Sequence, residues 1–300
     1  MKIFLTGATG YIGGSVASGL IAAGHNVVGL ARSEERAVEL RGKSIEPLIG
    51  SLDDHEILAR ASQDAEAIVN AANADDRGAA EAMLSAIVGS DKLFLHTSGS
   101  SIVGQRDQGE KSDAIFDETT PIEPSAARVA RVALNTDILA FSGKGVRAVV
   151  VCPSLIYGLG LGVNQHSMQV PWLIDLARKS GVARHIGSGE NIWSNVHIDD
   201  LMELYILAFD KAPAGGFYFA ENGEESMRDV CRSINKMLGV EGAPKEMSLD
   251  DASAEWGEGP ANNTMASNSR VRANRARQEL GWAPKAPSLI NELERGCYAN

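Results

Sequence analysis

The sequence predicts an α/β protein in which helices cover both faces of a parallel sheet. An apolar N-terminal strand leads directly into evenly spaced glycines. Short, continuous apolar runs then alternate with helical patterns, which is typical of strands buried on both faces. With 44% hydrophobic residues among 300, the chain can also enclose a large core. Strands are expected at residues 2–5, 27–30, 44–49, 67–70, 92–96, 146–151 and 216–220.

Residues 1–14 form the segment around which the expected fold is organised. The first strand is followed by Gly7, Gly10 and Gly13, and a helical pattern covers residues 11–23. This order brings backbone N–H groups and the positive end of a helix dipole to one point, where a pyrophosphate can bind. A merely structural turn is the alternative, but the position between strand and helix favours dinucleotide binding. The expected contacts are Gly7, Thr9, Gly10, Tyr11, Ile12 and Gly13.

The end of the second expected strand indicates which dinucleotide binds. A preference for NAD usually requires an Asp or Glu here, because that carboxylate holds the ribose hydroxyls. This chain has Arg32 and Ser33 instead. Arg32 can pair with a 2′-phosphate and Ser33 can donate a hydrogen bond, so NADP is favoured over NAD. The alternative is a solvated arginine beside an ordinary charged helix start.

Bulk properties narrow the choice of function. The net charge of −11 argues against a nucleic-acid-binding surface. No apolar run approaches the length of a membrane span, and no secretion signal is recognisable at the start. The three cysteines lack metal-ligand spacing, so we expect reduced thiols, no metal site and a cytoplasmic location.

Five motifs in register give a resemblance to a known family. The Gly-x-x-Gly-x-x-Gly spacing with Thr6, Ala8 and Thr9 resembles the short-chain dehydrogenase/reductase superfamily. Four later segments resemble its extended branch, the epimerase/dehydratase group: Asp117-Glu118-Thr119-Thr120-Pro121, Pro153-Ser154-Leu155-Ile156-Tyr157-Gly158, His197-Ile198-Asp199-Asp200-Leu201 and Leu280-Gly281-Trp282-Ala283-Pro284. The resemblance implies a Rossmann-type doubly wound sheet with a smaller C-terminal substrate-binding part. Residues 1–160 with 205–222 would form the NAD(P)-binding domain, and residues 161–204 with 223–300 the smaller part.

The resemblance also implies cofactor contacts beyond the glycine turn. Leu52 would pack on the adenine and Asp53 would lie near its amino group, although Asp53 and Asp54 also suit a helix start. The small residues Ala71 and Ala72, with Asn73, would let the backbone approach the cofactor. Pro153 and Leu155 would lie beside the nicotinamide.

The catalytic positions depart from the family pattern. The usual Ser falls on Gly99, and the Tyr and Lys of Tyr-x-x-x-Lys fall on Ala127 and Arg131. Because no tyrosine occurs between residues 11 and 157, the usual proton donor is missing. Arg131 can still hold ribose hydroxyls, but arginine stays protonated and is a poor acid.

Several residues could replace the missing groups. Ser100, with Ser98 or Ser101 as alternatives, could bind the substrate carbonyl, although polar residues in a strand-end loop need no such role. Tyr157 is a spare phenol near the expected site, and its alternative is core packing. His166 could donate a proton near neutral pH, and its alternative is a surface or structural histidine.

The leading hypothesis is an NADP-dependent oxidoreductase that transfers hydride to or from a small carbonyl- or imine-type substrate. Two other hypotheses stay open: a non-catalytic NADP-sensing regulatory protein, and a sugar-nucleotide epimerase or dehydratase. The last is weakened by the absent tyrosine and by the lack of an arginine between residues 160 and 171 to clamp a second pyrophosphate. A homodimer is suggested by the resemblance alone.

Overall fold

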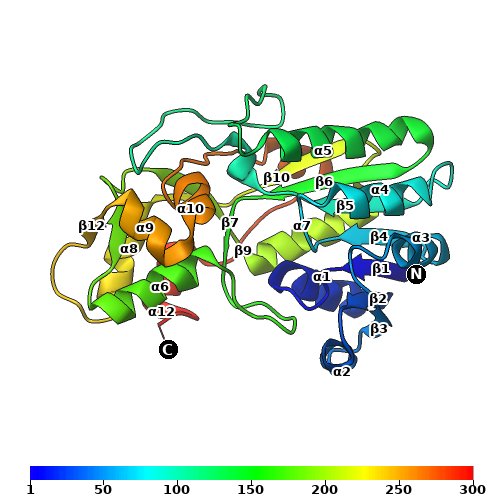
Figure 1. The fold of residues 1–300 in the computed structure, drawn as a ribbon, viewed down its shortest axis with the longest axis horizontal. Helices are drawn as coiled ribbons and strands as arrows, with labels where there is room; N and C mark the ends of the chain where they lie inside the picture. The colour runs from blue at the N-terminus through cyan, green and yellow to red at the C-terminus, as the bar shows by residue number, and fades with distance from the viewer. Residues whose placement is uncertain (300) are drawn as a thin grey trace.

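The computed structural model describes residues 1–299 and contains a seven-stranded, all-parallel sheet in the order β10-β6-β5-β4-β1-β2-β3 (Figure 1). The order reverses between β1 and β4, as in Rossmann-type sheets, and ligands bind such sheets at the reversal. The strands are β1 (Lys2–Thr6), β2 (Asn26–Ala31), β3 (Glu46–Ile49), β4 (Ala67–Asn70), β5 (Leu93–Thr97), β6 (Arg147–Pro153) and β10 (Gly216–Ala220). The predicted fold class and the seven predicted strands are confirmed, with ends that differ by one or two residues.

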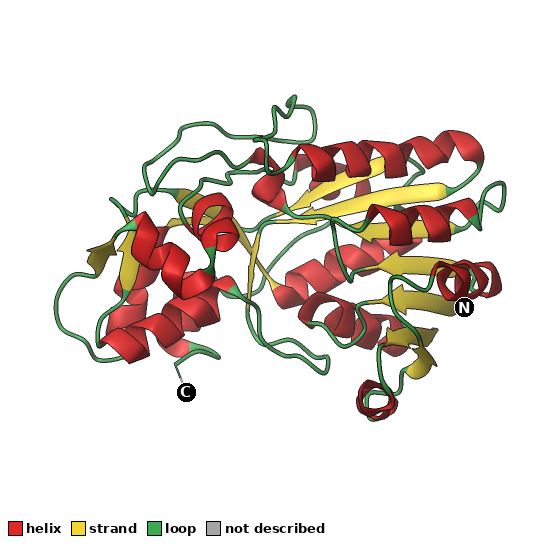
Figure 2. Ribbon diagram, in the orientation of Figure 1, coloured by secondary structure: helices red, strands yellow, loops and turns green. Residues whose placement is uncertain are grey.

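Helices cover both faces of this sheet (Figure 2). One face packs against α1 (Tyr11–Ala22), α2 (Glu34–Arg41), α7 (Ile198–Lys211) and α11 (Asn274–Leu280). The other packs against α3 (His55–Asp64), α4 (Arg77–Ser85) and α5 (Val129–Ala140). Successive strand residues point to opposite faces of the sheet. Ile3 and Leu5 therefore pack on the face covered by α1, and Phe4 packs on the face covered by α3. Burial on both faces explains why the strands are apolar without alternation.

A smaller part lies beyond the carboxyl ends of the strands and has its own core, which includes Tyr157, Leu173 and Trp193. Its strands form two small sheets: β7 (Leu155–Tyr157), β9 (Ile192–His197) and β11 (Glu224–Ser226), and β8 (Arg184–Ile186) with β12 (Lys245–Met247). Its helices are α6 (Gln169–Ser180), α8 (Met227–Met237), α9 (Leu249–Trp256), α10 (Glu258–Pro260) and α12 (Leu289–Arg295), with the π-helical turn η3 (Ala261–Met265). Two short 3₁₀ turns, η1 (Ser100–Val103) and η2 (Phe141–Lys144), flank α5. No helix in residues 1–299 combines the length and the apolar character needed to cross a bilayer.

Two helices, α7 and α11, pack in the larger part of the molecule although the expected division assigns all or some of their residues to the smaller part. Helix α7 starts at Ile198 and its first turns are already buried in the core of the larger part, so the expected boundary at residue 205 falls inside a helix. Helix α11 packs beside α7 and β10, although it follows residue 223. Trp282, which follows α11, holds this segment against α7, because its indole nitrogen donates to the Asp200 carbonyl at 2.9 Å.

The glycine turn between β1 and α1 is held together by backbone contacts that exclude side chains. Gly7 has a φ of +79°, and a Cβ there would lie 2.5 Å from the Ala71 carbonyl oxygen. A Cβ on Gly13 would lie 2.2 Å from the Gly7 carbonyl oxygen. The first strand, the first helix and the loop after β4 therefore approach one another as closely as backbones can.

Three buried polar residues link the carboxyl ends of β1, β4 and β5 next to this turn. Thr6 Oγ1 donates to Asn70 Oδ1 at 2.6 Å, and Asn70 Nδ2 donates to His96 Nδ1 at 3.1 Å. His96 Nε2 is buried without a partner in residues 1–299. Burial lowers the pKa of His96 to about 4, and the positive charge of Arg131 adds to this effect. His96 is therefore neutral at pH 7.

We expect this histidine to make the fold sensitive to acid. Its pKa in the folded state lies below the unfolded value of about 6.5, so its contribution to stability is fully present above that pH and is lost as the pH falls toward 4. The free energy of unfolding should therefore drop by about 3 kcal/mol more in the wild type than in His96→Gln over this interval. Urea unfolding at several pH values measures it. His55→Gln, at an exposed histidine, should behave as the wild type does, and equal acid sensitivity in both variants would contradict the expectation.

Candidate active site

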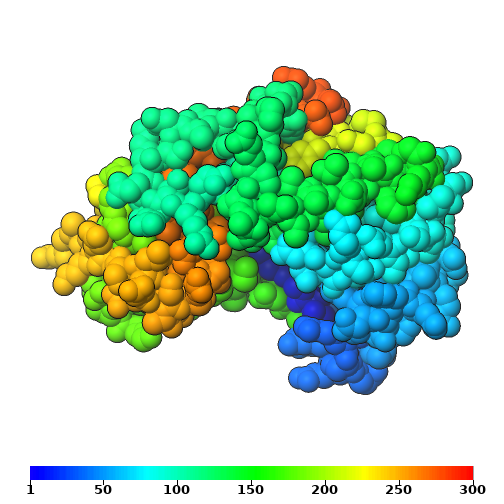
Figure 3. Space-filling view, turned by 45° about the horizontal axis from the view of Figure 1, so that its top comes forward, coloured from blue at the N-terminus to red at the C-terminus, as the bar shows by residue number. Residues whose placement is uncertain are grey.

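Two cavities open at the carboxyl edge of the large sheet, on either side of the glycine turn. Figure 3 shows the surface hollowed between the two parts of the molecule, with N-terminal residues, in dark blue, at the floor of the hollow. The glycine-turn cavity is lined by Gly7, Thr9 and Gly10 and measures about 460 Å³. The serine-loop cavity is lined by residues 98–101 and measures about 300 Å³. Ile12, on the first turn of α1, lines the second cavity, so one helix start borders both.

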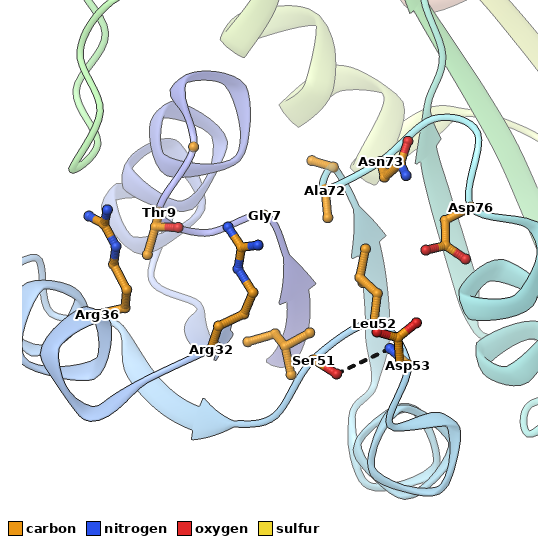
Figure 4. A pocket seen from close by; sticks show the side chains of 13 residues that line it. Gly7, Thr9, Arg32, Arg36, Ser51, Leu52, Asp53, Ala72, Asn73 and Asp76 are labelled. Carbon is orange, nitrogen blue, oxygen red and sulfur yellow. Dashed lines mark hydrogen bonds between the residues drawn. The ribbon is translucent and has the colours of Figure 1, made fainter.

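The glycine-turn cavity gathers residues from four loops that follow strands (Figure 4). Arg32 and Arg36 come from the segment after β2, and Leu52 and Asp53 from the loop after β3. Of the predicted cofactor contacts, the structure places these here: Gly7, Thr9, Gly10, Arg32, Leu52, Asp53, Ala71, Ala72 and Asn73. Arg36, Ser51 and Asp76 also line the cavity and were not expected from the sequence.

Two arginines give one end of this cavity a positive charge. Arg32 forms no ion pair with any of residues 1–299, and Arg36 pairs with Glu39 at 2.7 Å on the surface of α2. Ser33 does not line the cavity. Its hydroxyl oxygen instead accepts a hydrogen bond from the Arg36 backbone N–H at 3.3 Å and caps α2. Arg32 and Arg36 therefore both line the cavity, while Ser33 between them does not.

The start of α1 suits a bound anion. Gly10 precedes the helix and supplies no capping side chain, and the first turn carries no acidic residue. Its free N–H groups and helix dipole therefore remain available at the cavity. Tyr11 and Gly13 are buried behind the turn, and the Tyr11 hydroxyl donates to the Gly158 carbonyl at 2.9 Å. The residues present thus fit the pyrophosphate of a dinucleotide.

The serine-loop cavity has a polar side and an apolar side. The polar side comes from the loop after β5 and the start of α5, and includes Ser98, Ser100, Ser101, Arg128 and Arg131. The apolar side comes from the smaller part and the segment that enters it, and includes Pro153, Ile156, Met168, Trp172 and Trp193. Leu155, expected beside the nicotinamide, is buried in the core of the smaller part and lines neither cavity.

Arg131 is fixed by a carboxylate from the loop after β4. Its Nε donates to Asp75 Oδ1 at 2.7 Å, and its Nη2 donates to Asp75 Oδ2. The remaining nitrogen, Nη1, donates to Ser101 Oγ at 3.3 Å. The hydrogen bonds and charge of Arg131 lower the pKa of Asp75, so the carboxylate is ionised at neutral pH. A chain of hydrogen bonds therefore runs from Asp75 through Arg131 to the Ser101 hydroxyl.

The hydroxyls of this cavity differ in what they can offer a substrate. Ser269 Oγ donates to the Ser100 carbonyl at 2.9 Å, so Ser100 donates its own hydroxyl hydrogen to Ser269 Oγ at 2.7 Å. Ser154 Oγ donates to the Ala220 carbonyl at 2.8 Å. Ser98 accepts a hydrogen bond from Asn135 Nδ2 at 2.8 Å. The Ser101 hydroxyl oxygen accepts a hydrogen bond from Arg131. Its hydrogen is donated to no group in residues 1–299 and is therefore available to a ligand in the cavity.

The structure does not bring Tyr157 or His166 into either cavity. Tyr157 is fully buried, and its hydroxyl donates to the Pro287 carbonyl at 2.8 Å. His166 is exposed in the loop between β7 and α6, where its backbone N–H donates to Asn164 Oδ1 at 3.1 Å. None of the five tyrosines of the chain lines the serine-loop cavity.

Arg128 is the residue of this cavity that the sequence did not single out. Its Nε is buried without a partner, and it forms no ion pair within residues 1–299. Burial lowers the pKa of Arg128, and the nearby charge of Arg131 lowers it further. The two arginines differ because Asp75 is hydrogen-bonded to Arg131, whereas it acts on Arg128 only through space. The same described residues hold no cluster of acidic, histidine or cysteine side chains fit for a metal ion.

Comparisons with known proteins found a matching family, related chains and similar folds. Residues 3–218 match the NAD dependent epimerase/dehydratase family. Oxidase ucsJ of Acremonium sp is 32% identical, over 98% of this chain and 95% of that protein. The 2-alkyl-3-oxoalkanoate reductase of Stenotrophomonas maltophilia is 27% identical, over 82% of this chain and 77% of that protein. The dTDP-glucose 4,6-dehydratase DesIV of Streptomyces venezuelae, solved with NAD and TYD bound, has a similar fold with a TM-score of 0.79 at 18% identity, over 99% of this chain and 95% of that chain.

We expect Arg131→Gln to raise the pKa of Asp75, because burial alone raises the pKa of this carboxyl and the arginine opposes it. The depressed pKa means that the pair adds stability above about pH 4 and that this contribution is lost as the pH falls further. A carboxyl ¹³C NMR titration measures the pKa directly. Arg60→Gln, at an exposed arginine of α3, is the control and should leave Asp75 unchanged. An Asp75 pKa that stays low without Arg131 would show that another group stabilises the carboxylate.

Proposed function

Since the chain belongs to the NAD dependent epimerase/dehydratase family, among NAD(P)-dependent oxidoreductases, we propose that it uses NADP to transfer hydride to or from a small carbonyl- or imine-type substrate. One observation carries the proposal. The glycine-turn cavity has unshared positive charge at one end, and the serine-loop cavity has a hydroxyl prepared to donate at the other. The start of α1 borders both cavities and would place the pyrophosphate between them.

The choice of NADP over NAD rests on Arg32 and Arg36. A ribose 2′-phosphate carries charge that a guanidinium can bind in a bidentate manner. No acidic residue stands at the end of β2, where a carboxylate would favour NAD by holding the free ribose hydroxyl. Leu52 and Asp53 would border the adenine on the same side of the cavity.

The remaining residues would bind the substrate and its oxygen. When bound, the dinucleotide would supply or accept the hydride. Ser101 would donate a hydrogen bond to the carbonyl oxygen, and the hydrogen bond that it accepts from Arg131 makes its own hydroxyl a better donor. Asp75 would keep Arg131 in place. Arg131 is too weak an acid to deliver a proton, so the proton would reach the oxygen from water, and an imine would enter already protonated.

The size of the serine-loop cavity supports a small substrate. At about 300 Å³ it lies at the lower end of the range for small-molecule sites. Its cations, Arg128 and Arg131, stand together at the start of α5 and leave no second charged group for a nucleotide diphosphate on the opposite wall. Carbonyl reduction is also the activity in the names of two relatives, a ketoreductase and a 2-alkyl-3-oxoalkanoate reductase.

We expect Arg32→Asp to abolish the preference for NADPH. The variant loses a charge-assisted contact to the 2′-phosphate and adds repulsion, so the Kd for NADPH should rise about 10- to 100-fold while the Kd for NADH changes little. Titration of both nucleotides by fluorescence measures the two constants. Arg178→Asp, at an exposed arginine of α6, should leave both unchanged. Equal binding of NADPH and NADH by the wild type would remove Arg32 from the site.

We expect Ser101→Ala to lower kcat about 100-fold with a smaller effect on KM, because the lost hydrogen bond is strongest when charge develops on the oxygen. Oxidation of NADPH with a panel of small oxo acids, ketones and imines provides the assay. Ser154→Ala is the matched control, since that serine lines the same cavity but donates to the Ala220 carbonyl. No oxidation of NADPH with any member of the panel would contradict the proposed function. An intact kcat in Ser101→Ala would contradict the role of Ser101 alone.

A further inference from the structure

The serine-loop cavity contains one cation without an ion-pair partner among residues 1–299, and this is Arg128. Among residues 1–299, both oxygens of Asp75 are engaged by Arg131, and no carboxylate lies within ion-pair distance of Arg128. A buried polar atom without a partner is costly, and Arg128 Nε is such an atom. Because other atoms of the Arg128 side chain line the cavity, its positive charge stands where a ligand can neutralise it.

The surroundings of Arg128 also favour a negative charge. Arg128 stands immediately before α5, a helix of 12 residues whose first turn contains no acidic residue and whose start has no capping side chain. The positive end of the helix dipole and the nearby Arg131 add to the charge of Arg128. A single carboxylate would satisfy the fork of donors on the guanidinium.

The cavity lining that comes from the smaller part is mostly apolar, with Gln169 and Thr264 as its polar members. Trp172, Ile156 and Met168 belong to this lining, without a charged neighbour on that side. Trp193 also presents only its ring, because its indole nitrogen donates to the Ser267 carbonyl at 2.7 Å. A ligand that fills the cavity therefore needs an anionic end toward α5 and a hydrocarbon part toward the tryptophans.

We propose that Arg128 binds a carboxylate of the substrate, so that the substrate is a small oxo acid with an apolar substituent. This inference rests on the proposed function for the reaction, but the carboxylate site can be tested without turnover. Ser101 would donate a hydrogen bond to the oxo oxygen of the substrate, and Arg128 would bind its carboxylate. Trp172 and Trp193 would pack on the apolar substituent. Arg128 is then the residue that selects acids over neutral carbonyl compounds.

The kinetic test compares small oxo acids with their methyl esters, which keep the carbonyl and lose the charge. The wild type should prefer the acids about 10- to 100-fold in kcat/KM, mainly through KM, as expected for a charged hydrogen bond. Arg128→Gln should abolish this preference by raising the KM for the acids toward that for the esters, and Arg128→Lys should retain part of it. Arg106→Gln, at an exposed arginine after the serine loop, should behave as the wild type does. An equal preference for acids in the wild type and in Arg128→Gln would overturn the inference.

A binding test separates this inference from the proposed function. Benzoate and methyl benzoate, which carry no reducible ketone, are titrated into the protein with NADP⁺ present while tryptophan fluorescence is followed. We expect benzoate to bind more tightly than its ester, and Arg128→Gln to lose this difference while it still binds NADP⁺, which shows that it is folded. Tighter binding of benzoate, together with no oxidation of NADPH by any oxo acid, ketone or imine of the panel, would support the carboxylate site and contradict the proposed function. Equal binding of benzoate and its ester by the wild type would overturn the carboxylate site.

Discussion

The close approach of three backbone segments at Gly7 is the constraint on which the rest of the structure depends. The Gly7 turn, the start of α1 and the loop after β4 meet with no space for a side chain. This contact brings the loops after β1 and β4 together at the carboxyl edge of the sheet. Both cavities lie at that edge, in agreement with the rule that ligands bind at the switch point of a doubly wound sheet.

The arginines of the two cavities acquire different roles from their partners. Asp75 neutralises Arg131, so this residue is a fixed hydrogen-bond donor to Ser101 rather than a free charge. Arg32 and Arg128 have no such partner within residues 1–299, so each leaves a positive charge for a ligand. In the proposed function, arginines would thus serve as a positioning group at one place and as anion sites at two others. The proposed reaction without a tyrosine depends on the same difference, since a cation-supported serine would hold the carbonyl oxygen.

The sequence predicted the parts that depend on local pattern. Buried parallel strands, the glycine turn and the serine loop follow from continuous apolar runs and from glycine spacing, so the seven strands and most residues of the glycine-turn cavity were predictable. The partners of side chains were not. Ser100 looked like the natural replacement for the missing serine, but Ser269, far away in the chain, takes its hydrogen. Tyr157 looked spare until the fold placed its hydroxyl on the Pro287 carbonyl. Arg128 resembled any charged residue at a helix start, and only the three-dimensional arrangement shows that Asp75 serves Arg131 and leaves Arg128 unpaired.

The most direct measurement is a crystal structure of the wild-type protein with NADP⁺. The geometry of the two cavities predicts that the 2′-phosphate contacts Arg32 and Arg36, that the pyrophosphate lies over Gly10 at the start of α1, and that the nicotinamide reaches the serine-loop cavity beside Ser101 and Arg131. A dinucleotide bound with its nicotinamide outside that cavity, or with its 2′-phosphate away from both arginines, would contradict the assignment of the two cavities to one oxidoreductase site.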